Sequence, residues 1–397
     1  MLELAEAQKR ILKAIEPLPK ESVLLSSGLG RVTAEPILST VNLPPFDNSA
    51  VDGYAVRCAD LFNATVEAPV ELALAGKIAA GEYYAGSLPP GLCLRIFTGS
   101  PMPHGADAVV MQEDVVATGQ PSFRESIKPW ENIRFQGEDV RAGSVLAPPG
   151  IRLNPGALGL LAACGLAEFA AIPRPRVAIL ATGSELREPG ETLLPGQIHE
   201  SNRAMISALV IRAGGEPVVF PIVRDDLRST VESLERAFAQ CDVVVTAGGV
   251  SVGEYDFVKT AFTELGGEVE FWKIAMRPGK PFVFGRRRGK FLFGLPGNPV
   301  SALVTFILLA GPALAKLGGM ADSALRRRPG ILAEAMNNPG DRRHFVRVHC
   351  DVSGSVRAAG IQASHRLASL ARANGLLEIG PGTNLEAGSP VEVIDLD

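Results

Sequence analysis

The chain contains 397 residues, a length that predicts two to four domains at roughly 100 to 200 residues each. Hydrophobic residues make up 46% of it and charged residues 21%, so several buried cores are expected and extensive disorder is excluded. The 39 basic and 43 acidic residues give a net charge of -4, which excludes a broad electrostatic surface for nucleic acid or anionic lipid. Any anion-binding site must therefore be local.

The cysteines and the apolar segments predict a protein of the cytoplasm. The five cysteines lie far apart and form no CxxC pair, so neither a disulfide framework nor a zinc site is expected. Residues 1–20 mix charged side chains into a helical pattern and lack the apolar core of a signal peptide. The apolar stretch 291–315 is interrupted by Pro296, Pro299 and Pro312, and is interpreted as a strand, a turn and a buried helix.

The first half of the chain predicts an arm that carries a small β-rich domain. Residues 1–46 begin with a helical repeat and continue into a proline-rich extended segment, and residues 140–175 contain an apolar helical run at 158–166. Residues 47–139 contain short apolar runs separated by glycine, proline and asparagine, which is typical of short strands. The β-rich domain is therefore predicted as an insertion into the elongated arm.

The second half predicts a doubly wound α/β domain followed by a small β-barrel. Across residues 176–327 apolar strands alternate with helical repeats, including a strand at 177–180 and a helix at 202–213, so a parallel sheet with helices on both faces is expected. Residues 328–397 contain short alternating segments with turns between them, as in a small barrel or sandwich. The predicted fold class is multidomain α/β plus β.

Two loops of the α/β domain are rich in glycine and hydroxyl groups. They are residues 181–185 (ATGSE) and 246–254 (TAGGVSVGE), and each follows a predicted strand. In open α/β sheets ligands bind outside the carboxyl ends of the strands. Glycine permits a close backbone approach there, so the loops could cradle an anion, although ordinary turns also use glycine.

Two further loops carry cations and free helix amides. The RPGKP turn contains Arg277 and Lys280 and follows Lys273 closely, although such charges often belong to a solvated surface. In the LPGNP loop Asn298 is predicted to cap a helix and Pro299 to occupy its first position. Cations and amides bind oxyanions, whereas the carboxylates of neighbouring loops suit Mg²⁺. The combination favours phosphate-ester chemistry.

Two common nucleotide-binding motifs are missing from the sequence. There is no GxxxxGKS motif, which argues against a P-loop NTPase, and no GxGxxG motif after a first strand, which argues against a dinucleotide-dependent dehydrogenase. The five histidines are too scattered along the chain to predict a metal site.

A series of longer motifs resembles the molybdopterin molybdenumtransferases of the MoeA family, which includes the gephyrin E domain. In the first half of the chain the motifs are PPFDNSAVDGYA at 44–55, RIFTG at 95–99 and GEDVRAG at 137–143. In the second half they are TGSEL at 182–186, GGVSVGE at 248–254, PGKP at 278–281 and GLPGNP at 294–299. The resemblance covers essentially the whole chain in order, and is far more specific than any single glycine-rich loop.

The resemblance implies an enzyme of molybdenum cofactor biosynthesis. It would use Mg²⁺ to insert molybdenum from molybdate into adenylylated molybdopterin and would release AMP. The α/β domain would be of the MogA/MoaB-like type, and the protein would be a homodimer whose active cleft lies between the α/β domain of one subunit and the small β domain of the other. A molybdopterin adenylyltransferase is the expected donor of the substrate, and no nucleic-acid or membrane partner is expected.

The resemblance also implies a set of functional residues. The catalytic group is Asp52, Thr98, Asp139, Glu185, Asp225, Asp256 and Lys273. Of these, the expected metal ligands are Glu185, Asp225 and Asp256. The substrate-binding group is Thr182, Gly183, Ser184, Gly248, Gly249, Ser251, Gly253, Arg277, Lys280, Pro296, Gly297, Asn298, Pro299, Arg347 and Ser364. Molybdate would be held through charge-assisted hydrogen bonds by Lys273, Arg277, Lys280, Arg347 and Ser364.

Two other functions stay open at this stage. Single-domain relatives of the α/β part adenylylate molybdopterin, but the arm, the small β domain and the barrel argue against that step here. A scaffold that binds receptor tails, as gephyrin does, is the other alternative. That role belongs to a larger fused chain with an additional adenylyltransferase domain, which is not expected here.

Overall fold

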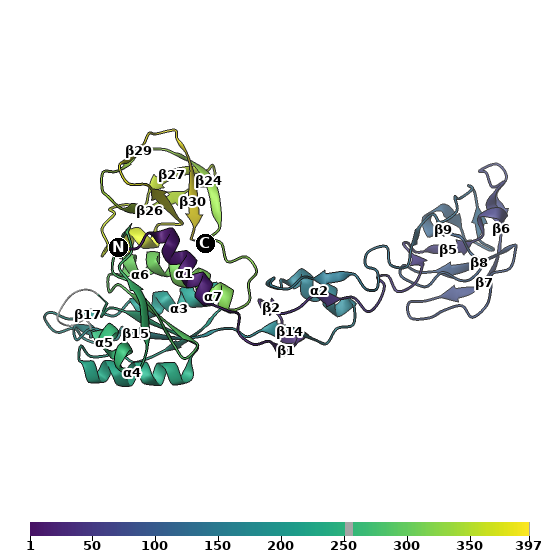
Figure 1. Ribbon diagram of the computed structural model, residues 1–397. Coiled ribbons are helices and arrows are strands. Elements are labelled where there is room, and N and C mark those ends of the chain that lie inside the picture. The colour runs from purple at the N-terminus through teal and green to yellow at the C-terminus, as the bar shows by residue number, and fades with distance from the viewer. Residues whose placement is uncertain (251–256, 397) are drawn as a thin grey trace.

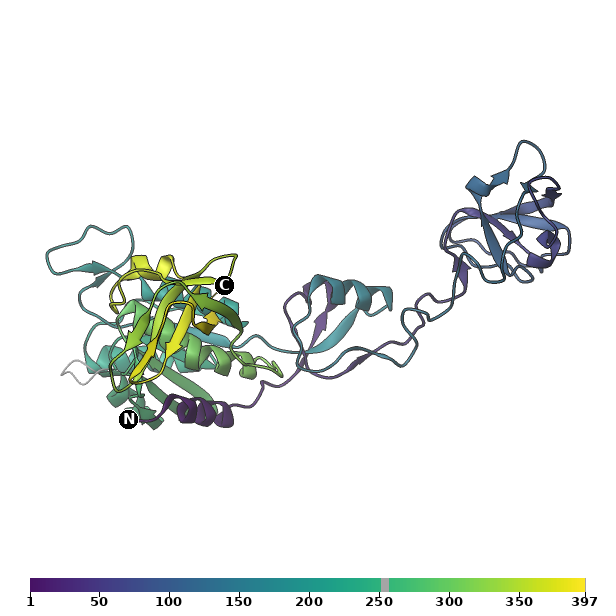
Figure 2. The same cartoon turned by 90° about the horizontal axis from the view of Figure 1, so that it is seen from above.

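An α/β domain and a C-terminal β-barrel form one end of an elongated molecule, and a small β-rich domain forms the other (Figure 1, Figure 2). The computed structural model describes residues 1–250 and 257–396. A narrow arm joins the two ends, and the chain runs through it twice, outward and back. This arrangement confirms the predicted multidomain fold class.

The first helix, α1 (Leu4–Ala14), packs on the α/β domain and not on the arm to which the sequence analysis assigned it. Its buried residues Leu4, Ala7 and Ile11 recur at the spacing of one helical face. That face joins the core formed by the strands and helices of the α/β domain. The N-terminal helix therefore lies where its apolar face is buried. The spacing of its apolar residues predicts that face, but it does not predict which domain buries it.

Two short antiparallel sheets and one helix form the arm. Its elements are β1 (Glu21–Leu24), β2 (Val32–Thr33), β3 (Ile37–Leu38), β13 (Val145–Ala147), α2 (Pro155–Ala163) and β14 (Glu168–Ile172). Strand β14 pairs with β1 and β2, and β13 pairs with β3. The outgoing and returning segments are thus hydrogen-bonded to each other, which gives the narrow arm a defined structure. Helix α2 overlaps the helical run predicted at 158–166, but it begins and ends three residues earlier.

The small β domain is built on a four-stranded sheet in the order β7-β8-β5-β9. Its strands are β4 (Asn48–Ser49), β5 (Gly53–Val56), β6 (Val70–Glu71), β7 (Ala73–Ile78), β8 (Leu92–Ile96), β9 (Ala108–Met111), β10 (Val115–Val116), β11 (Ser122–Phe123) and β12 (Ile133–Arg134). Apolar side chains on the two faces of the sheet form two small cores. Strand β4 pairs with β12, so the domain begins and ends at the same place, next to the arm.

The α/β domain has a six-stranded sheet in the order β18-β15-β19-β23-β22-β20. These strands are β15 (Arg176–Ala181), β18 (Glu216–Val219), β19 (Val243–Ala247), β20 (Glu268–Trp272), β22 (Val283–Arg287) and β23 (Lys290–Leu295). Five strands run in the same direction, and β22 is antiparallel to both of its neighbours, β20 and β23. The sheet is therefore mixed rather than wholly parallel, because β22 and β23 are consecutive strands joined by a tight turn.

Helices cover both faces of this sheet (Figure 1). They are α3 (Asn202–Ala213), α4 (Leu227–Gln240), α5 (Phe257–Glu264), α6 (Pro299–Thr305), a π-helical turn (Phe306–Ala310) and α7 (Gly311–Leu317). Helices α4 and α5 share one core with the sheet, and the others share the second core. The continuous helix Pro299–Leu317 is long and apolar enough to span a membrane, but 78% of its apolar window is buried within the protein. It is the predicted buried helix.

Five strands of the C-terminal domain close into a barrel. They are β24 (Arg327–Leu332), β26 (Arg343–Cys350), β27 (Ser355–Ala358), β28 (Gly375–Ile379) and β30 (Pro390–Asp395). Closure follows from the pairing of β26 with β28 in addition to the order β26-β27-β24-β30-β28. Strand β21 (Met276–Arg277) of the α/β domain also pairs with β26 and so joins the barrel to that domain.

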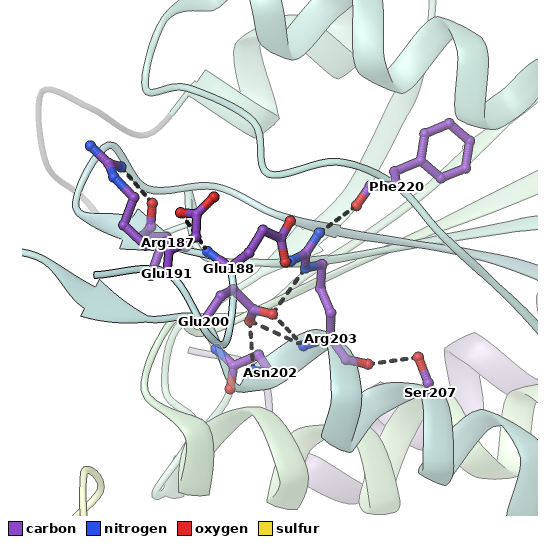
Figure 3. Close-up of polar contacts among 9 residues, drawn as sticks. Arg187, Glu188, Glu191, Glu200, Asn202, Arg203, Ser207 and Phe220 are labelled. Carbon is purple, nitrogen blue, oxygen red and sulfur yellow. Dashed lines mark hydrogen bonds and ion pairs between the residues drawn. The ribbon is translucent and has the colours of Figure 1, made fainter. Parts of the chain in front are cut away.

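A buried ion-pair network fixes the start of helix α3 (Figure 3). Glu200 Oε1 accepts hydrogen bonds from the backbone N–H groups of Asn202 (2.6 Å) and Arg203 (3.1 Å) and so satisfies free donors of the first helical turn. Arg203 Nε donates to Glu200 Oε2 at 2.9 Å, and its terminal nitrogens reach Glu188 Oε2 (2.5 Å) and the Phe220 carbonyl oxygen (2.8 Å). The network thereby ties the segment 188–200 to α3.

Replacing Arg203 by Met is expected to lower the free energy of unfolding by about 3–5 kcal/mol, because Glu200, whose side chain is 3% exposed, would keep a buried charge without its partner. Urea unfolding followed by circular dichroism measures the change. Arg228→Met is the matched control, since the Arg228–Glu232 pair lies on the surface and contributes roughly 1 kcal/mol or less. Equal effects of the two substitutions would contradict the stabilising role of the network.

Candidate functional site

Three turns meet at the carboxyl edge of the parallel strands. The Thr182 N–H donates to the Ala247 carbonyl oxygen (3.1 Å), and the Gly248 N–H donates to the Leu295 carbonyl oxygen (3.0 Å). The turns that follow β15, β19 and β23 are therefore hydrogen-bonded to one another in sequence across the sheet. The glycine-rich loop at 181–185 and the described part of the loop at 246–254 therefore lie beside the LPGNP loop at the edge where ligands were expected.

Glycine is required where these turns approach most closely. Gly248 has φ +96°, and a Cβ atom there would lie 2.8 Å from the Thr182 carbonyl oxygen. Gly249 has φ +66°, and a Cβ atom there would lie 2.7 Å from the Val258 side chain. A Cβ on Gly297 would lie in ordinary van der Waals contact with the Gly248 Cα, at 3.7 Å, so that position does not require glycine. Larger residues at 248 and 249 would force the neighbouring segments apart, so these two glycines serve the close backbone approach predicted for them.

The cradle formed by these turns contains a polar atom that has no partner among residues 1–250 and 257–396. Within that part of the chain the buried hydroxyl oxygen of Thr182 makes no hydrogen bond, and the same holds for Thr246 near the end of β19. Buried polar groups are nearly always hydrogen-bonded, so an unpaired hydroxyl beside a backbone cradle is typical of a site that binds a polar ligand.

Two of the three predicted metal-binding carboxylates lie at the first turn: Glu185 belongs to it, and Asp225, from the segment before α4, is hydrogen-bonded to it. Asp225 Oδ2 accepts the Ser184 N–H at 2.7 Å, and the Asp225 N–H donates to Ser184 Oγ at 3.3 Å. The Glu185 carboxylate folds back over Gly183. A Cβ on Gly183 would lie only 2.7 Å from Glu185 Oε2.

The remaining predicted residues of this edge, Ser251, Gly253 and Asp256, lie outside the described residues. Within residues 1–250 and 257–396 no group of three or more His, Cys, Asp or Glu side chains is placed to hold a metal ion. Mg²⁺ is commonly bound by one or two carboxylates together with water and substrate phosphates. Glu185 and Asp225 suit that type of site.

A cation-lined cavity lies between the RPGKP turn and the barrel. It has a volume of about 400 Å³. The polar side chains around it belong to Arg277, Lys280, Ser301, Arg342, His344, Gln362, Ser364 and His365. Pairing of β21 with β26 places Arg277 beside His344 and so brings the turn and the barrel together. Burial, together with the nearby charges of Arg277 and Arg347, lowers the pKa of His344 to about 4. His344 is therefore neutral near pH 7, and the positive charge of the cavity comes from arginine and lysine.

The structure places Arg347 differently from the sequence-based expectation that it binds molybdate directly. Its side chain is buried, and Nη2 donates to the carbonyl oxygens of Ile361 (2.9 Å) and Ala363 (3.2 Å), while Nε donates to Ser369 Oγ (3.0 Å). Arg347 thus supports the segment that presents Ser364 to the cavity. The sequence marks Arg347 as a cation, but it does not show that the packing of the barrel buries this side chain away from the cavity.

Asn298 occupies the N-cap position of helix α6, as predicted, but its side chain does not cap the helix. Its side chain makes no cap hydrogen bond, and Nδ2 donates to Ser364 Oγ at 3.2 Å. The Ser364 carbonyl oxygen also accepts the Val300 N–H at 3.2 Å. The LPGNP loop is therefore joined to the barrel wall of the cavity. Pro299 does occupy the first helical position, as predicted, and Pro296 is buried at the start of the loop.

A second cluster of predicted residues lies at the far end of the molecule, in the small β domain (Figure 1). Asp52 Oδ1 accepts both the backbone N–H and the hydroxyl group of Thr98, each at 2.8 Å. These two hydrogen bonds hold the pKa of the Asp52 carboxyl below its ordinary value. Asp139 is exposed at the junction with the arm, where its N–H donates to the Leu43 carbonyl oxygen. Within one chain, this cluster is separated from the α/β edge by the arm.

Several residues of the site could not be identified from the sequence. Ser301, Arg342 and His344 line the cavity because strand pairing and helix packing bring them there. Asn202, at the start of α3, donates from Nδ2 to the Gly297 carbonyl oxygen (2.8 Å) and so supports the LPGNP loop. None of these residues belongs to a motif that marks it as functional.

Comparisons with known proteins cover every domain. Residues 2–165 match the MoeA N-terminal region (domain I and II), residues 178–316 match a probable molybdopterin binding domain, and residues 329–396 match the MoeA C-terminal region (domain IV). The chain is 41% identical over 394 residues to molybdopterin molybdenumtransferase 2 of Mycobacterium tuberculosis, an alignment that covers 97% of this chain and 96% of that protein.

Two further relatives agree with this assignment. The molybdopterin molybdenumtransferase of Haemophilus influenzae is 39% identical over 405 residues, with 99% of this chain and 98% of that protein covered. The crystal structure of a molybdopterin biosynthesis MoeA protein from Pyrococcus horikosii superimposes with a TM-score of 0.87 at 33% sequence identity, and covers 100% of this chain and 99% of that one. The chain belongs to the MoeA family.

Proposed function

We propose that the protein is a molybdopterin molybdenumtransferase, a transferase of molybdenum cofactor biosynthesis. Relatives that carry this name match it over nearly their whole length. The structural observation that supports the proposal most strongly is the cavity at the RPGKP turn, where Arg277, Lys280 and Arg342 gather beside the glycine cradle. A small cavity lined by cations suits a tetrahedral oxyanion such as molybdate.

We further propose that the pterin substrate is adenylylated and that AMP is released when molybdenum is inserted. In this reaction Gly248 and Gly249 would let the substrate approach the backbone, and Arg277 and Lys280 would bind molybdate. Ser364, held by Asn298, would donate a hydrogen bond to a molybdate oxygen. The cations would also stabilise the negative charge that develops as water or a molybdate oxygen attacks phosphorus and the phosphoanhydride bond breaks. An adenylyltransferase is the proposed source of the substrate.

The first turn of the site suits Mg²⁺. The Thr182 hydroxyl, which has no partner among the residues that the structure describes, and the carboxylates of Glu185 and Asp225 supply only oxygen atoms, the ligands that Mg²⁺ prefers. Glu185 and Asp225 would hold the ion, with Asp256 as the third expected ligand. When bound, the ion would neutralise negative charge on the substrate phosphates.

We also propose a homodimer in which Asp52, Thr98 and Asp139 of one copy complete the α/β edge of the other. The separation of the two clusters along one elongated chain supports this arrangement (Figure 2). Asp52 is an ionised acceptor fixed by Thr98, so it would enter the shared cleft with a defined orientation.

Asp225→Asn is expected to lower molybdate-stimulated AMP release by at least about 100-fold, because a bound divalent ion supplies several kcal/mol of charge stabilisation. The assay contains purified protein, adenylylated molybdopterin, Mg²⁺ and molybdate, and follows AMP. Asp226→Asn is the matched control, since Asp226 caps helix α4 through the Ser229 N–H and Asn caps equally well. Absence of molybdate-stimulated AMP release by the unaltered protein would contradict the proposed activity itself.

Lys280→Met is expected to raise the molybdate concentration needed for half-maximal AMP release by roughly 10-fold or more, the effect of losing a charge-assisted hydrogen bond. Saturation of the rate with molybdate measures it. Arg343→Met is the control, because Arg343 adjoins His344 in sequence but pairs with Glu378 on the outside of the barrel. The same shift in both variants would indicate a general charge effect and contradict a molybdate site at Lys280.

Mixing Asp52→Ala and Asp225→Asn proteins after subunit exchange is expected to restore about a quarter of the unaltered activity, although each variant alone is nearly inactive. Half of the dimers would then be mixed, and each mixed dimer would contain one intact composite site. Differently tagged chains verify the exchange. If mixed dimers form and stay inactive, the two residues do not act across the subunits.

A further inference from the structure

The last residue of strand β20, Trp272, carries two lysine side chains against its indole ring. The Lys273 Nζ lies 3.8 Å from the ring centroid, and the Lys259 Nζ, from helix α5, lies 4.5 Å from it. Both distances are well within the range of a cation–π contact, and Trp is the aromatic residue that binds cations best. Trp272 therefore gathers two positive charges from different elements on one exposed ring.

These two charges are not neutralised by the described part of the chain. Among residues 1–250 and 257–396 neither ammonium group has a carboxylate within 4.0 Å, in contrast to the Arg286–Glu270 pair on the neighbouring strands. Both nitrogens contact the same ring, so they lie within roughly one Debye length of each other, about 8 Å at physiological salt, and repel. A bound anion would relieve that repulsion.

The position of the pair links it to the candidate site. Strand β20 is antiparallel to β22, which is antiparallel to β23, so β20 ends at the same edge of the sheet as the cradle. The Lys273 N–H donates to the Phe282 carbonyl oxygen (3.1 Å), and the Ile274 N–H donates to the Lys280 carbonyl oxygen (3.0 Å). The backbone of Lys273 is therefore fastened to the cationic turn that lines the cavity.

The backbone conformation of Lys273 is itself unusual. Its φ angle is +69°, in the left-handed region that side chains other than glycine rarely occupy. Such strain persists only where the surrounding structure holds it, and it occurs often at functional sites. Here the two backbone hydrogen bonds and the contact with the indole hold the residue in place.

We propose that Trp272 is a positioning residue that holds Lys259 and Lys273 as a two-cation clamp for phosphate oxygens of the substrate. The chemical class is a nucleotide joined through a phosphoanhydride. The inference rests on the proposed function, because that reaction supplies such a substrate to this edge. It adds Trp272 and Lys259 to the site, and it separates a phosphate-binding position from the molybdate cavity at Arg277 and Lys280.

The chain offers a direct reporter, because it contains only two tryptophans, Trp130 and Trp272. Trp130 lies in the small β domain, so the fluorescence of the Trp130→Phe protein reports on Trp272. Titration with pyrophosphate is expected to change this fluorescence saturably, and Lys259→Met is expected to weaken the binding about tenfold or more. Lys9→Met, on the exposed face of α1, is the charge-matched control and should leave the binding unchanged.

Three results of this titration would overturn the clamp. The first is an equal affinity for pyrophosphate in the Lys259→Met and unaltered proteins. The second is the absence of any saturable change in tryptophan fluorescence. The third is a fluorescence change with molybdate as large as the change with pyrophosphate. No turnover is needed, so pyrophosphate binding by a protein that lacks molybdenumtransferase activity would contradict the proposed function alone. Full activity with no pyrophosphate response would contradict the clamp alone.

The positioning role of Trp272 has a separate test. Trp272→Leu is expected to raise the KM for adenylylated molybdopterin about tenfold, whereas Trp272→Phe, which keeps an aromatic face, should recover most of the loss. The molybdate concentration for half-maximal rate should not change in either variant. Equal KM values in the Leu, Phe and unaltered proteins would overturn the role. If Trp272→Leu fails to fold, Trp272→Phe and the Lys259→Met titration still decide the matter.

Discussion

The site depends on the close approach of three backbone turns at the carboxyl edge of the sheet. Ala181, Ala247 and Leu295 are paired in register, so β15, β19 and β23 end at one level and their turns must share the same space. That space suffices only because residue 248 has no Cβ, which would otherwise lie 2.8 Å from the Thr182 carbonyl oxygen. The cradle, the carboxylates on the first turn and the LPGNP loop all take their positions from this contact.

The barrel completes the site through a shared strand pairing. Strand β21 pairs with β26, and the cavity forms where the RPGKP turn meets the barrel wall. Buried Arg347 holds this wall from behind through the Ile361 and Ala363 carbonyl oxygens. The α/β domain supplies the carboxylates and the cations of the RPGKP turn, and the barrel adds Arg342, so a protein of net charge -4 can contain a local anion site.

Much of the fold and the motif-bearing loops could be predicted from local patterns. The helix at 202–213 and the strand at 177–180 follow from periodicity, and the glycines of the cradle follow from the position of their loop after a buried strand. The antiparallel direction of β22, the packing of α1 on the α/β domain, the burial of Arg347 and the bond from Asn298 to Ser364 could not be predicted. Each depends on contacts between segments far apart in the sequence.

The central claim is that the cavity at Arg277 and Lys280 receives molybdate beside the cradle that receives the pterin substrate. Anomalous diffraction at the molybdenum absorption edge, from crystals soaked in molybdate, tests it most directly. A molybdenum peak within hydrogen-bonding reach of Arg277, Lys280 and Ser364 is the predicted result. A molybdenum peak elsewhere on the chain, with none in this cavity at saturating molybdate, would contradict the account.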